Sequence, residues 1–279
     1  MLPKHIWDLL IGHRIHVIAL GDPEQLPPVD EDNGVLANPH IFLDEIMRQA
    51  QESEIIRLSM HVREGRPLAT FEQAQTEVQI IAPAQVVSGM YEWADQIICA
   101  TNANRNKINM AMRKLKNFPD TPVQEDKIIS LKNHWECFSN QGSALTNGSI
   151  GHIVDSSVQR LEVPRYIIPQ GYLDVLYTDL LTEDNETFTG LFLDYQQLLT
   201  GEKTLQGKQE YQMLRSKMTM DPPFDFAYGY AITCWKAQGS EWDKVLLFEE
   251  NFPFSKEEHK RYLYTGITRA KNKIVIVRK

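Results

Sequence analysis

Four short apolar runs rich in β-branched residues determine what this chain can fold into. They cover residues 15–20, 97–100, 245–248 and 274–277. Continuous apolar runs of this length are typical of strands that are buried on both faces of a parallel sheet. Helical patterns lie between the runs, so the sequence predicts an α/β fold.

The N-terminal part of the chain combines helical patterns with the first apolar run. One amphipathic helix is expected to end near Leu10, and a second helical pattern covers about residues 42–58. The run at 15–20 needs neighbouring strands, and nothing before Met1 supplies them. We therefore expect the chain to be truncated, and poorly soluble at this edge.

The character of the sequence changes between Asp120 and Asp225. Short alternating apolar runs such as residues 127–131 are separated by turns that contain glycine. Alternation with a period of two predicts half-buried strands. We expect a β-barrel-like insertion that interrupts the α/β domain.

Composition excludes several classes of protein. Of the 279 residues, 42% are hydrophobic and 24% are charged, which is typical of a soluble globular protein. The sequence has no signal peptide and no apolar run of ~20 residues, so we expect a cytoplasmic protein without membrane association. The three cysteines lack the spacing of zinc or redox pairs. A net charge of -8 argues against general coating of nucleic acid but not against a narrow basic groove.

The loop after the first apolar run has the sequence GDPEQLPPV at residues 21–29. Open α/β sheets place functional loops at the ends of their strands. The loop resembles motif III of superfamily 1 helicases of the RecD-like and phage Dda-like branch. This resemblance implies that Gln25 senses the γ-phosphate of ATP and couples hydrolysis to movement along DNA. A proline-rich turn alone would not explain a glutamine at this position.

The segment LDEIMRQ at residues 43–49 resembles motif IV of the same family. The resemblance implies that Arg48 reaches the γ-phosphate from the second RecA-like domain. A guanidinium suits this task because it offers two parallel donors and keeps its charge. The alternative for a single arginine on a helix is a solvated side chain.

Residues 228–245 are similar to motif V and give the most specific signal in the chain. The resemblance implies that Thr233 and its neighbours, Lys236 included, contact the DNA backbone. It also implies that Glu241 contacts the nucleotide ribose, and Gly239 lets the backbone pass close to the nucleotide.

Trp235 departs from the family pattern, in which a histidine usually stands at this position. We expect the indole to stack on a base, because aromatic side chains bind single strands with little regard to sequence, at ~1–3 kcal/mol per base. The alternative is a tryptophan buried in the core.

The segment RYLYTGITRAK at residues 261–271 resembles motif VI. The resemblance implies that Arg269 is the arginine finger that stabilises charge on the transferred phosphoryl group. An arginine in this position contributes ~10³–10⁵ to turnover in phosphoryl-transfer enzymes.

A basic helix over residues 102–116 contains no acidic residue and follows Thr101. Members of the family have a similar threonine and asparagine before a basic helix, which implies DNA contacts by Thr101, Asn102 and Arg105. A solvated helix face is the competing interpretation.

The resemblance divides the chain into four segments. Residues 1–41 are expected to be the C-terminal remnant of a first RecA-like domain, and 42–119 with 225–279 to form a second RecA-like P-loop NTPase domain. Residues 120–224 are expected to form an inserted SH3-like β-barrel. The sequence contains neither a G-x-x-x-x-G-K-[ST] loop nor the Asp-Glu pair that holds magnesium. We expect both, and the ligands of Mg²⁺, in a missing N-terminal part, and no metal site in this chain.

The resemblance implies the C-terminal part of an ATP-dependent DNA helicase that moves 5′ to 3′ on single-stranded DNA, inactive as this fragment alone. Its expected partners are ATP, single-stranded DNA and duplex junctions, with a single-strand-binding or replication protein in addition. The rival hypothesis is a non-catalytic single-stranded nucleic-acid-binding fragment derived from a helicase.

Overall fold

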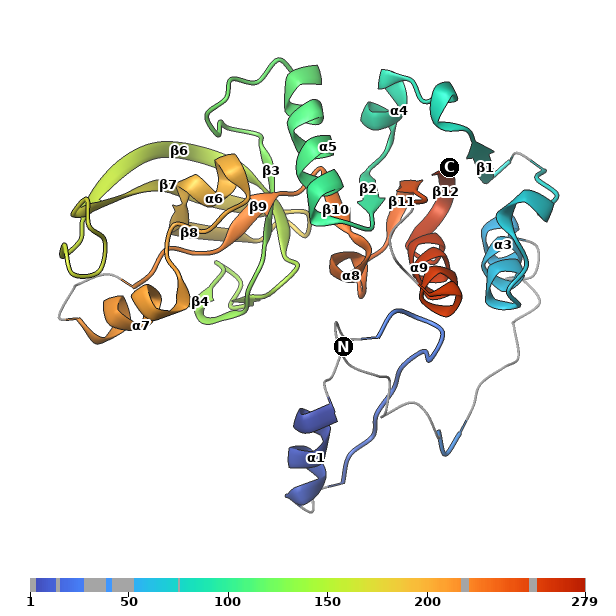
Figure 1. Ribbon diagram of the computed structural model, residues 1–279, viewed down its shortest axis with the longest axis horizontal. Helices are drawn as coiled ribbons and strands as arrows, with labels where there is room; N and C mark the ends of the chain where they lie inside the picture. Colours follow the sequence, from blue (N-terminus) through green and yellow to red (C-terminus); the bar gives the residue numbers. More distant parts are fainter. Residues whose placement is uncertain are drawn as a thin grey trace. The chain divides into compact units, whose positions relative to one another are not determined.

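The computed structural model describes residues 4–13, 16–27, 39–41, 53–74, 76–216, 221–250 and 255–278 (Figure 1). The chain divides into two compact units. The first consists of Met1–Thr101 and Ile232–Lys279, and the second of Asn102–Ala231.

A five-stranded sheet with the order β1-β12-β11-β2-β10 forms the centre of the first unit. Its strands are β1 (Val78–Ile81), β2 (Gln96–Cys99), β10 (Ala231–Thr233), β11 (Trp242–Phe248) and β12 (Ala270–Val277). The pairs β1–β12, β11–β12 and β11–β2 are parallel. The α/β fold with a parallel sheet is therefore confirmed, and β2 is buried along its whole length.

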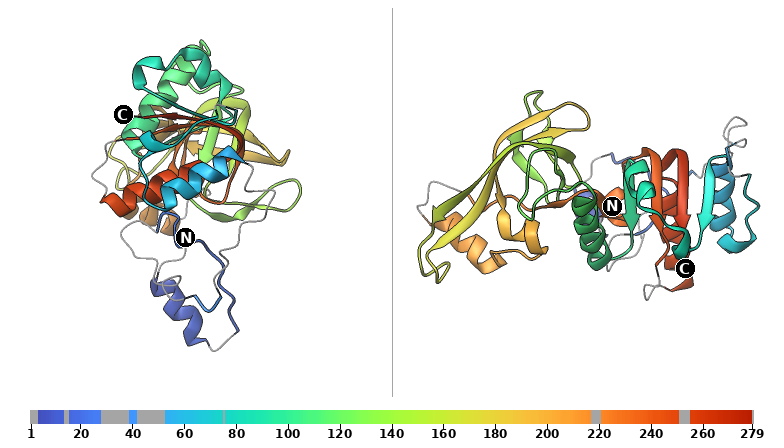
Figure 2. Two further views of the ribbon diagram at one scale, coloured as in Figure 1. Left: turned by 90° about the vertical axis from the view of Figure 1, so that its right-hand side faces the viewer. Right: turned by 90° about the horizontal axis from the view of Figure 1, so that it is seen from above.

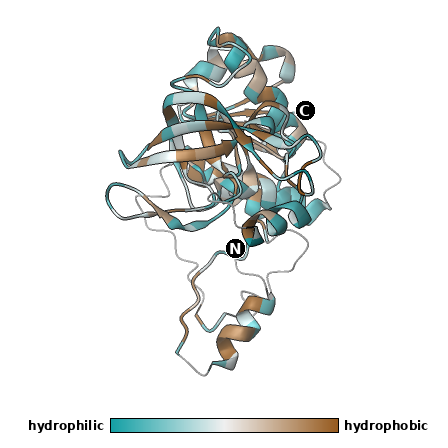
Figure 3. Cartoon of the chain, turned by 90° about the vertical axis from the view of Figure 1, so that its left-hand side faces the viewer, coloured by the Kyte–Doolittle hydropathy of each residue, from teal (hydrophilic) through white to brown (hydrophobic). Residues whose placement is uncertain are grey.

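Helices pack against this sheet. The helix α3 (Glu54–Arg63) lies beside α9 (Lys256–Ile267), as Figure 2 shows. The side chains of Leu58 on α3 and Tyr262 on α9 are completely buried. The remaining described helical elements of the unit are α1 (Lys4–Gly12), η1 (Leu68–Thr70), η2 (Pro83–Gln85), α4 (Ser88–Trp93) and α8 (Cys234–Ala237). The predicted N-terminal helix is thus present, and Figure 3 shows apolar and polar residues alternating around it.

The prediction of a buried strand at residues 15–20 is wrong for the residues that the structure describes. Residues 16–20 form no strand, and Ile18 and Leu20 are 88% and 92% exposed. No strand in the described ranges pairs with this run. An apolar segment becomes a buried strand only where a neighbouring strand accepts its hydrogen bonds.

Glu54, in the first turn of α3, closes the outer edge of the sheet. Among the strands that the structure describes, β1 pairs only with β12. On the other side the Glu54 carboxylate accepts from the backbone N–H of Val78 at 3.2 Å, and Gln73 Oε1 accepts from the N–H of Ile80 at 2.7 Å. In return, Glu77 accepts from the N–H of Ile55 in the first turn of α3 at 3.2 Å. Helix and strand therefore satisfy each other's unpaired donors.

The second unit is rich in β-structure, as the sequence predicts. Its antiparallel sheet has the order β8-β7-β6-β3-β9, and a separate hairpin joins β4 and β5. The elements are α5 (Asn102–Leu115), β3 (Lys127–Ser130), β4 (His134–Phe138), β5 (Ala144–Leu145), β6 (Ile150–Glu162), β7 (Tyr172–Thr182), β8 (Thr187–Asp194), α6 (Tyr195–Thr200), α7 (Gly207–Arg215) and β9 (Phe226–Tyr228). Its likeness to an SH3 barrel stays a prediction.

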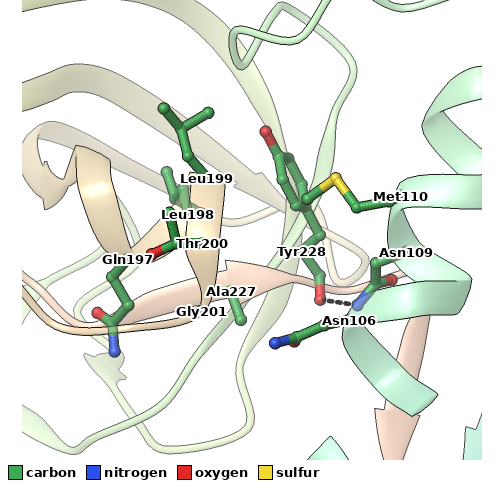
Figure 4. A pocket seen from close by; sticks show the side chains of 10 residues that line it. All are labelled: Asn106, Asn109, Met110, Gln197, Leu198, Leu199, Thr200, Gly201, Ala227 and Tyr228. Atoms are coloured by element: carbon green, nitrogen blue, oxygen red, sulfur yellow. Dashed lines mark hydrogen bonds between the residues drawn. The ribbon is translucent and has the colours of Figure 1, made fainter. Parts of the chain in front are cut away.

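This unit is wider than the predicted insertion of residues 120–224 because α5 packs into it. The side-chain amide of Asn109 donates to the carbonyls of Tyr228 and Ala231 at 2.8 and 3.1 Å, and its oxygen accepts from the Ala231 N–H at 2.7 Å. Figure 4 shows the hydrogen bond to Tyr228 among the residues that line a cavity. The volume of this cavity is about 30 Å³.

Within the described ranges, no helix has the length and apolar character needed to cross a bilayer.

Candidate functional site

The loop of residues 21–27 is attached to α8 and α9, although more than 200 residues separate them in the sequence. The N–H of Leu26 donates to Thr265 Oγ1 at 2.9 Å, and its carbonyl accepts from Gln238 Nε2 at 2.9 Å. The indole N–H of Trp235 donates to the carbonyl of Pro27 at 3.2 Å. Leu26 itself is only 3% exposed. Three motifs that the sequence indicated separately therefore lie together in the first unit.

Asp22 organises the turn that carries Gln25. Its Oδ1 accepts from the N–H of Glu24 at 3.0 Å, and its Oδ2 accepts from Gln25 Nε2 at 3.3 Å. The hydroxyl of Tyr264, on α9, donates to the same Oδ2 at 2.8 Å. Lys260, also on α9, forms an ion pair with Glu24 at 3.0 Å. The predicted γ-phosphate sensor is thus held by a carboxylate that is itself bound to α9.

Arg269 is 9% exposed and is fixed by the backbone around it. Its Nε donates to the carbonyl of Thr265 at 3.0 Å, and its Nη1 to that of Ser240 at 3.1 Å. Its Nη2 donates to Thr268 Oγ1 at 3.0 Å. Burial lowers the pKa of the guanidinium, which keeps its charge because an arginine titrates far above neutrality. These contacts use three of its five N–H groups, and the described residues accept no bond from the other two.

The loop between α8 and β11 carries the other predicted nucleotide contacts. Gly239 has a φ of +89°, a left-handed conformation that favours glycine. Glu241 is 63% exposed and forms an ion pair with Lys271 at 3.0 Å. An exposed carboxylate next to a glycine turn is accessible to the hydroxyl groups of a ribose.

Thr233, Trp235 and Lys236 lie in succession where β10 ends and α8 begins. Thr233 is 8% exposed, whereas Trp235 and Lys236 are half-buried. Trp235 is therefore neither a core tryptophan nor a freely exposed ring. Its indole N–H donates to the carbonyl of Pro27, and its stacking on a base stays a prediction.

The predicted contacts around the start of α5 differ in exposure. Thr101 donates to Glu250 Oε2 at 3.0 Å, and Asn102 is exposed. Arg105 is only 8% exposed, and its guanidinium donates to Asn106 Oδ1 at 3.1 and 2.9 Å. The side chain of Arg105 is thus buried, and its contact with phosphates stays a prediction. The exposed cations of α5 and its C-terminal end are Lys107, Lys114 and Lys116.

Arg48 lies outside the described residues, so its predicted role stays a prediction. The sequence reasoning missed Asp22, Gln238, Tyr264 and Thr265, which tie the site together. All four stand inside the motifs that were singled out, at polar positions to which no role was assigned.

Comparison with known proteins supports the helicase resemblance. Residues 228–277 match the UvrD-like helicase C-terminal domain. The chain is 24% identical over 281 residues to the ATP-dependent RecD2 DNA helicase of Deinococcus radiodurans, covering 92% of this chain and 32% of that protein. The chain therefore spans about a third of this curated relative. The predicted resemblance to superfamily 1 helicases of the RecD-like branch is confirmed.

Two solved helicase structures are similar to this chain, with TM-scores below 0.5. A Pif1 helicase from Candida albicans gives a TM-score of 0.49 at 16% identity, covering 93% of this chain and 62% of that one. A Pif1 helicase from Bacteroides in complex with ADP-AlF3 and ssDNA gives 0.46 at 17% identity, covering 92% of this chain and 60% of that one.

Proposed function

We propose that this chain is part of an ATP-dependent DNA helicase that couples ATP hydrolysis to 5′ to 3′ movement along single-stranded DNA and to duplex unwinding. The observation that carries the proposal is the attachment of the 21–27 loop to α8 and α9. It brings Gln25 into the same compact unit as Arg269, which lies inside the segment that matches a helicase domain. The relative in Deinococcus radiodurans is an ATP-dependent DNA helicase.

ATP would be held by Gln25, Arg48, Glu241 and Arg269, with Gly239 giving the nucleotide room. Bound ATP would supply the transferable phosphoryl group, and Mg²⁺ would neutralise its charge through ligands that we expect outside this chain. Arg269 suits a phosphate because it is a fixed cation with unused donors. Gln25 presents one amide hydrogen and its carbonyl oxygen, since the other hydrogen is bound to Asp22.

The DNA strand would contact Thr233 and Lys236 through its backbone and stack a base on Trp235. Thr101 and Asn102 would add polar contacts near the start of α5, and the exposed lysines of that helix would attract phosphates. Opening and closing of a cleft between two RecA-like domains would then advance the protein along the strand.

We propose that the β-rich part of the second unit is an SH3-like barrel, and that the complete protein binds duplex junctions. A single-strand-binding or replication protein is a further partner that this role suggests. The proposed compartment is the cytoplasm.

The proposal is tested by DNA-dependent ATP hydrolysis in a polypeptide that joins this chain to the expected phosphate-binding loop. Turnover that rises when single-stranded DNA is added, with unwinding of a forked duplex bearing a 5′ tail, is the expected result. Binding of single-stranded DNA without any ATP turnover in that polypeptide would overturn the proposal and identify a binding protein.

A further inference from the structure

We infer that Asp22 and Tyr264 are positioning residues, whose carboxylate–hydroxyl contact sets the orientation of the Gln25 side chain relative to α9. The inference rests on the proposed function, because the role of Gln25 towards phosphate is part of it. It adds two residues to which no role is assigned by the helicase resemblance.

The geometry at Asp22 fixes which end of the Gln25 amide is available. A carboxylate accepts hydrogen bonds and donates none, so the nitrogen of Gln25 must face Asp22 Oδ2. Tyr264 donates to the same oxygen at 2.8 Å and holds that oxygen in place. Gln25 Oε1 is therefore directed away from Asp22 and is left to accept from a water or another donor.

Tyr264 remains a donor over the physiological pH range. Burial, together with its hydrogen bond to Asp22, raises the pKa of its phenol above the ordinary value. A protonated phenol next to a carboxylate forms a short, charge-assisted contact, which orients both groups better than a neutral pair would.

The next residue along α9 extends the connection to Arg269. Thr265 Oγ1 accepts from the N–H of Leu26, and the carbonyl of Thr265 accepts from Arg269 Nε at 3.0 Å. The last turn of α9 thus touches the Gln25 loop through two side chains and Arg269 through its backbone. A displacement of this turn would move both proposed nucleotide contacts together.

The test uses nuclear magnetic resonance on the full 279-residue chain without nucleotide. Tyr264→Phe removes one hydroxyl and keeps the ring. We expect the side-chain amide of Gln25 to exchange its hydrogens ~10-fold faster, as loss of a charge-assisted hydrogen bond would allow. The backbone amide of Leu26, bound to Thr265, should change by much less.

Two further variants keep the result decisive. Asp22→Ala removes the acceptor of the contact at a half-buried position. It should accelerate the exchange of the Gln25 side-chain amide as well, so the inference can be tested even if Tyr264→Phe lowers stability. Tyr211→Phe is the matched control, because Tyr211 is 56% exposed on α7, and it should change neither amide. Unchanged exchange at Gln25, or equal acceleration at Gln25 and Leu26, would overturn the positioning role.

Binding of a fluorescein-labelled oligothymidylate to the same samples separates this inference from the proposed function. A wild-type chain that fails to bind the oligonucleotide contradicts the proposed function. The exchange rates are measured without DNA or nucleotide, so they decide the roles of Asp22 and Tyr264 in either case.

Discussion

Arg113 and Asp126 form a two-point ion pair inside the second unit. Arg113 Nε lies 2.9 Å from Asp126 Oδ1 and Nη2 lies 3.1 Å from Oδ2, with the two side chains 4% and 0% exposed. The guanidinium also donates to the carbonyls of Asp120 and Thr121 and lies 4.5 Å above the ring of Tyr228. One arginine of the predicted basic helix therefore serves the core rather than the surface.

Arg113→Ala is expected to lower the free energy of unfolding by ~3–5 kcal/mol, because it leaves the Asp126 charge buried without its cationic partner. Urea unfolding followed by circular dichroism measures the loss. The control is Lys114→Ala at the neighbouring exposed position, with an expected change within about 0.5 kcal/mol. Similar losses in the two variants would show that the ion pair contributes little.

Glu54 is expected to make the first unit sensitive to acid. Burial raises the pKa of this carboxyl, but hydrogen bonds from Glu77, Val78, Ala74 and Thr76 outweigh burial and lower the pKa from 4.5 to about 2. The folded state therefore gains stability from Glu54 above pH 4.5, and loses it as the pH falls from 4.5 towards 2. The contribution is at most ~3 kcal/mol.

Unfolding measured between pH 7 and pH 3 tests this. Glu54→Gln should lower stability at pH 7 and flatten its decline in acid, whereas Glu72→Gln, at an exposed position, should do neither. A Glu54→Gln variant with the wild-type pH profile would contradict the assignment.

Trp235→Ala is expected to weaken the binding of an oligothymidylate on the order of tenfold, through the loss of one stacked base. Trp235→Phe keeps an aromatic face but loses the bond to Pro27, so it should retain most of the affinity. Fluorescence anisotropy measures both. Trp93→Ala, at a half-buried tryptophan on α4, is the control. Equal affinities of Trp235→Ala and the wild type would remove the stacking role.

Arg269→Ala is expected to reduce ATP turnover by ~10³ or more in the polypeptide that includes the phosphate-binding loop. Nucleotide binding should change only a few-fold, since the guanidinium acts mainly on developing charge. Arg269→Lys keeps the charge but loses the planar set of guanidinium N–H donors, so its turnover should be nearly as low as that of Arg269→Ala. Steady-state hydrolysis together with binding of a fluorescent ATP analogue checks both statements. Substantial turnover in Arg269→Ala would exclude the finger role.

Lys107→Gln is expected to lower the salt dependence of single-strand binding, with a slope of log affinity against log salt reduced by about 0.7 for one lost phosphate contact. Lys107 is exposed on α5, whereas Arg105 is buried, so we expect Lys107 to make the phosphate contact on this helix. Lys208→Gln on α7 is the control. If the slope for Lys107→Gln equals that of the wild type, Lys107 contacts no phosphate and the basic side of α5 is a solvated helix face.

The strands of the parallel sheet could be predicted because burial on both faces leaves a continuous apolar run. The runs at 97–100, 245–248 and 274–277 correspond to β2, β11 and β12. The run at 15–20 has the same composition, yet residues 16–20 are not a strand. Composition reports a tendency to be buried, whereas a strand also requires a neighbour to pair with.

The candidate site was predictable residue by residue but not as a network. The contact between Asp22 and Tyr264 joins residues 242 positions apart, and no local pattern encodes it. The burial of Arg105 did have a signal: with Asn109 and Arg113 it repeats at intervals of four, on one face of α5. Polar residues at such spacing look like a solvated stripe until their buried partners are known.

The side-chain closure of β1 also bears on how copies of this protein behave towards each other. An outer strand with unsatisfied N–H groups is a template on which a second chain can add its own strand. Glu54 and Gln73 already occupy the N–H groups of Val78 and Ile80. Acid that protonates Glu54 would therefore do more than loosen one contact. It would expose the N–H of Val78 at the edge of the sheet, so that loss of fold and self-association would begin at the same pH.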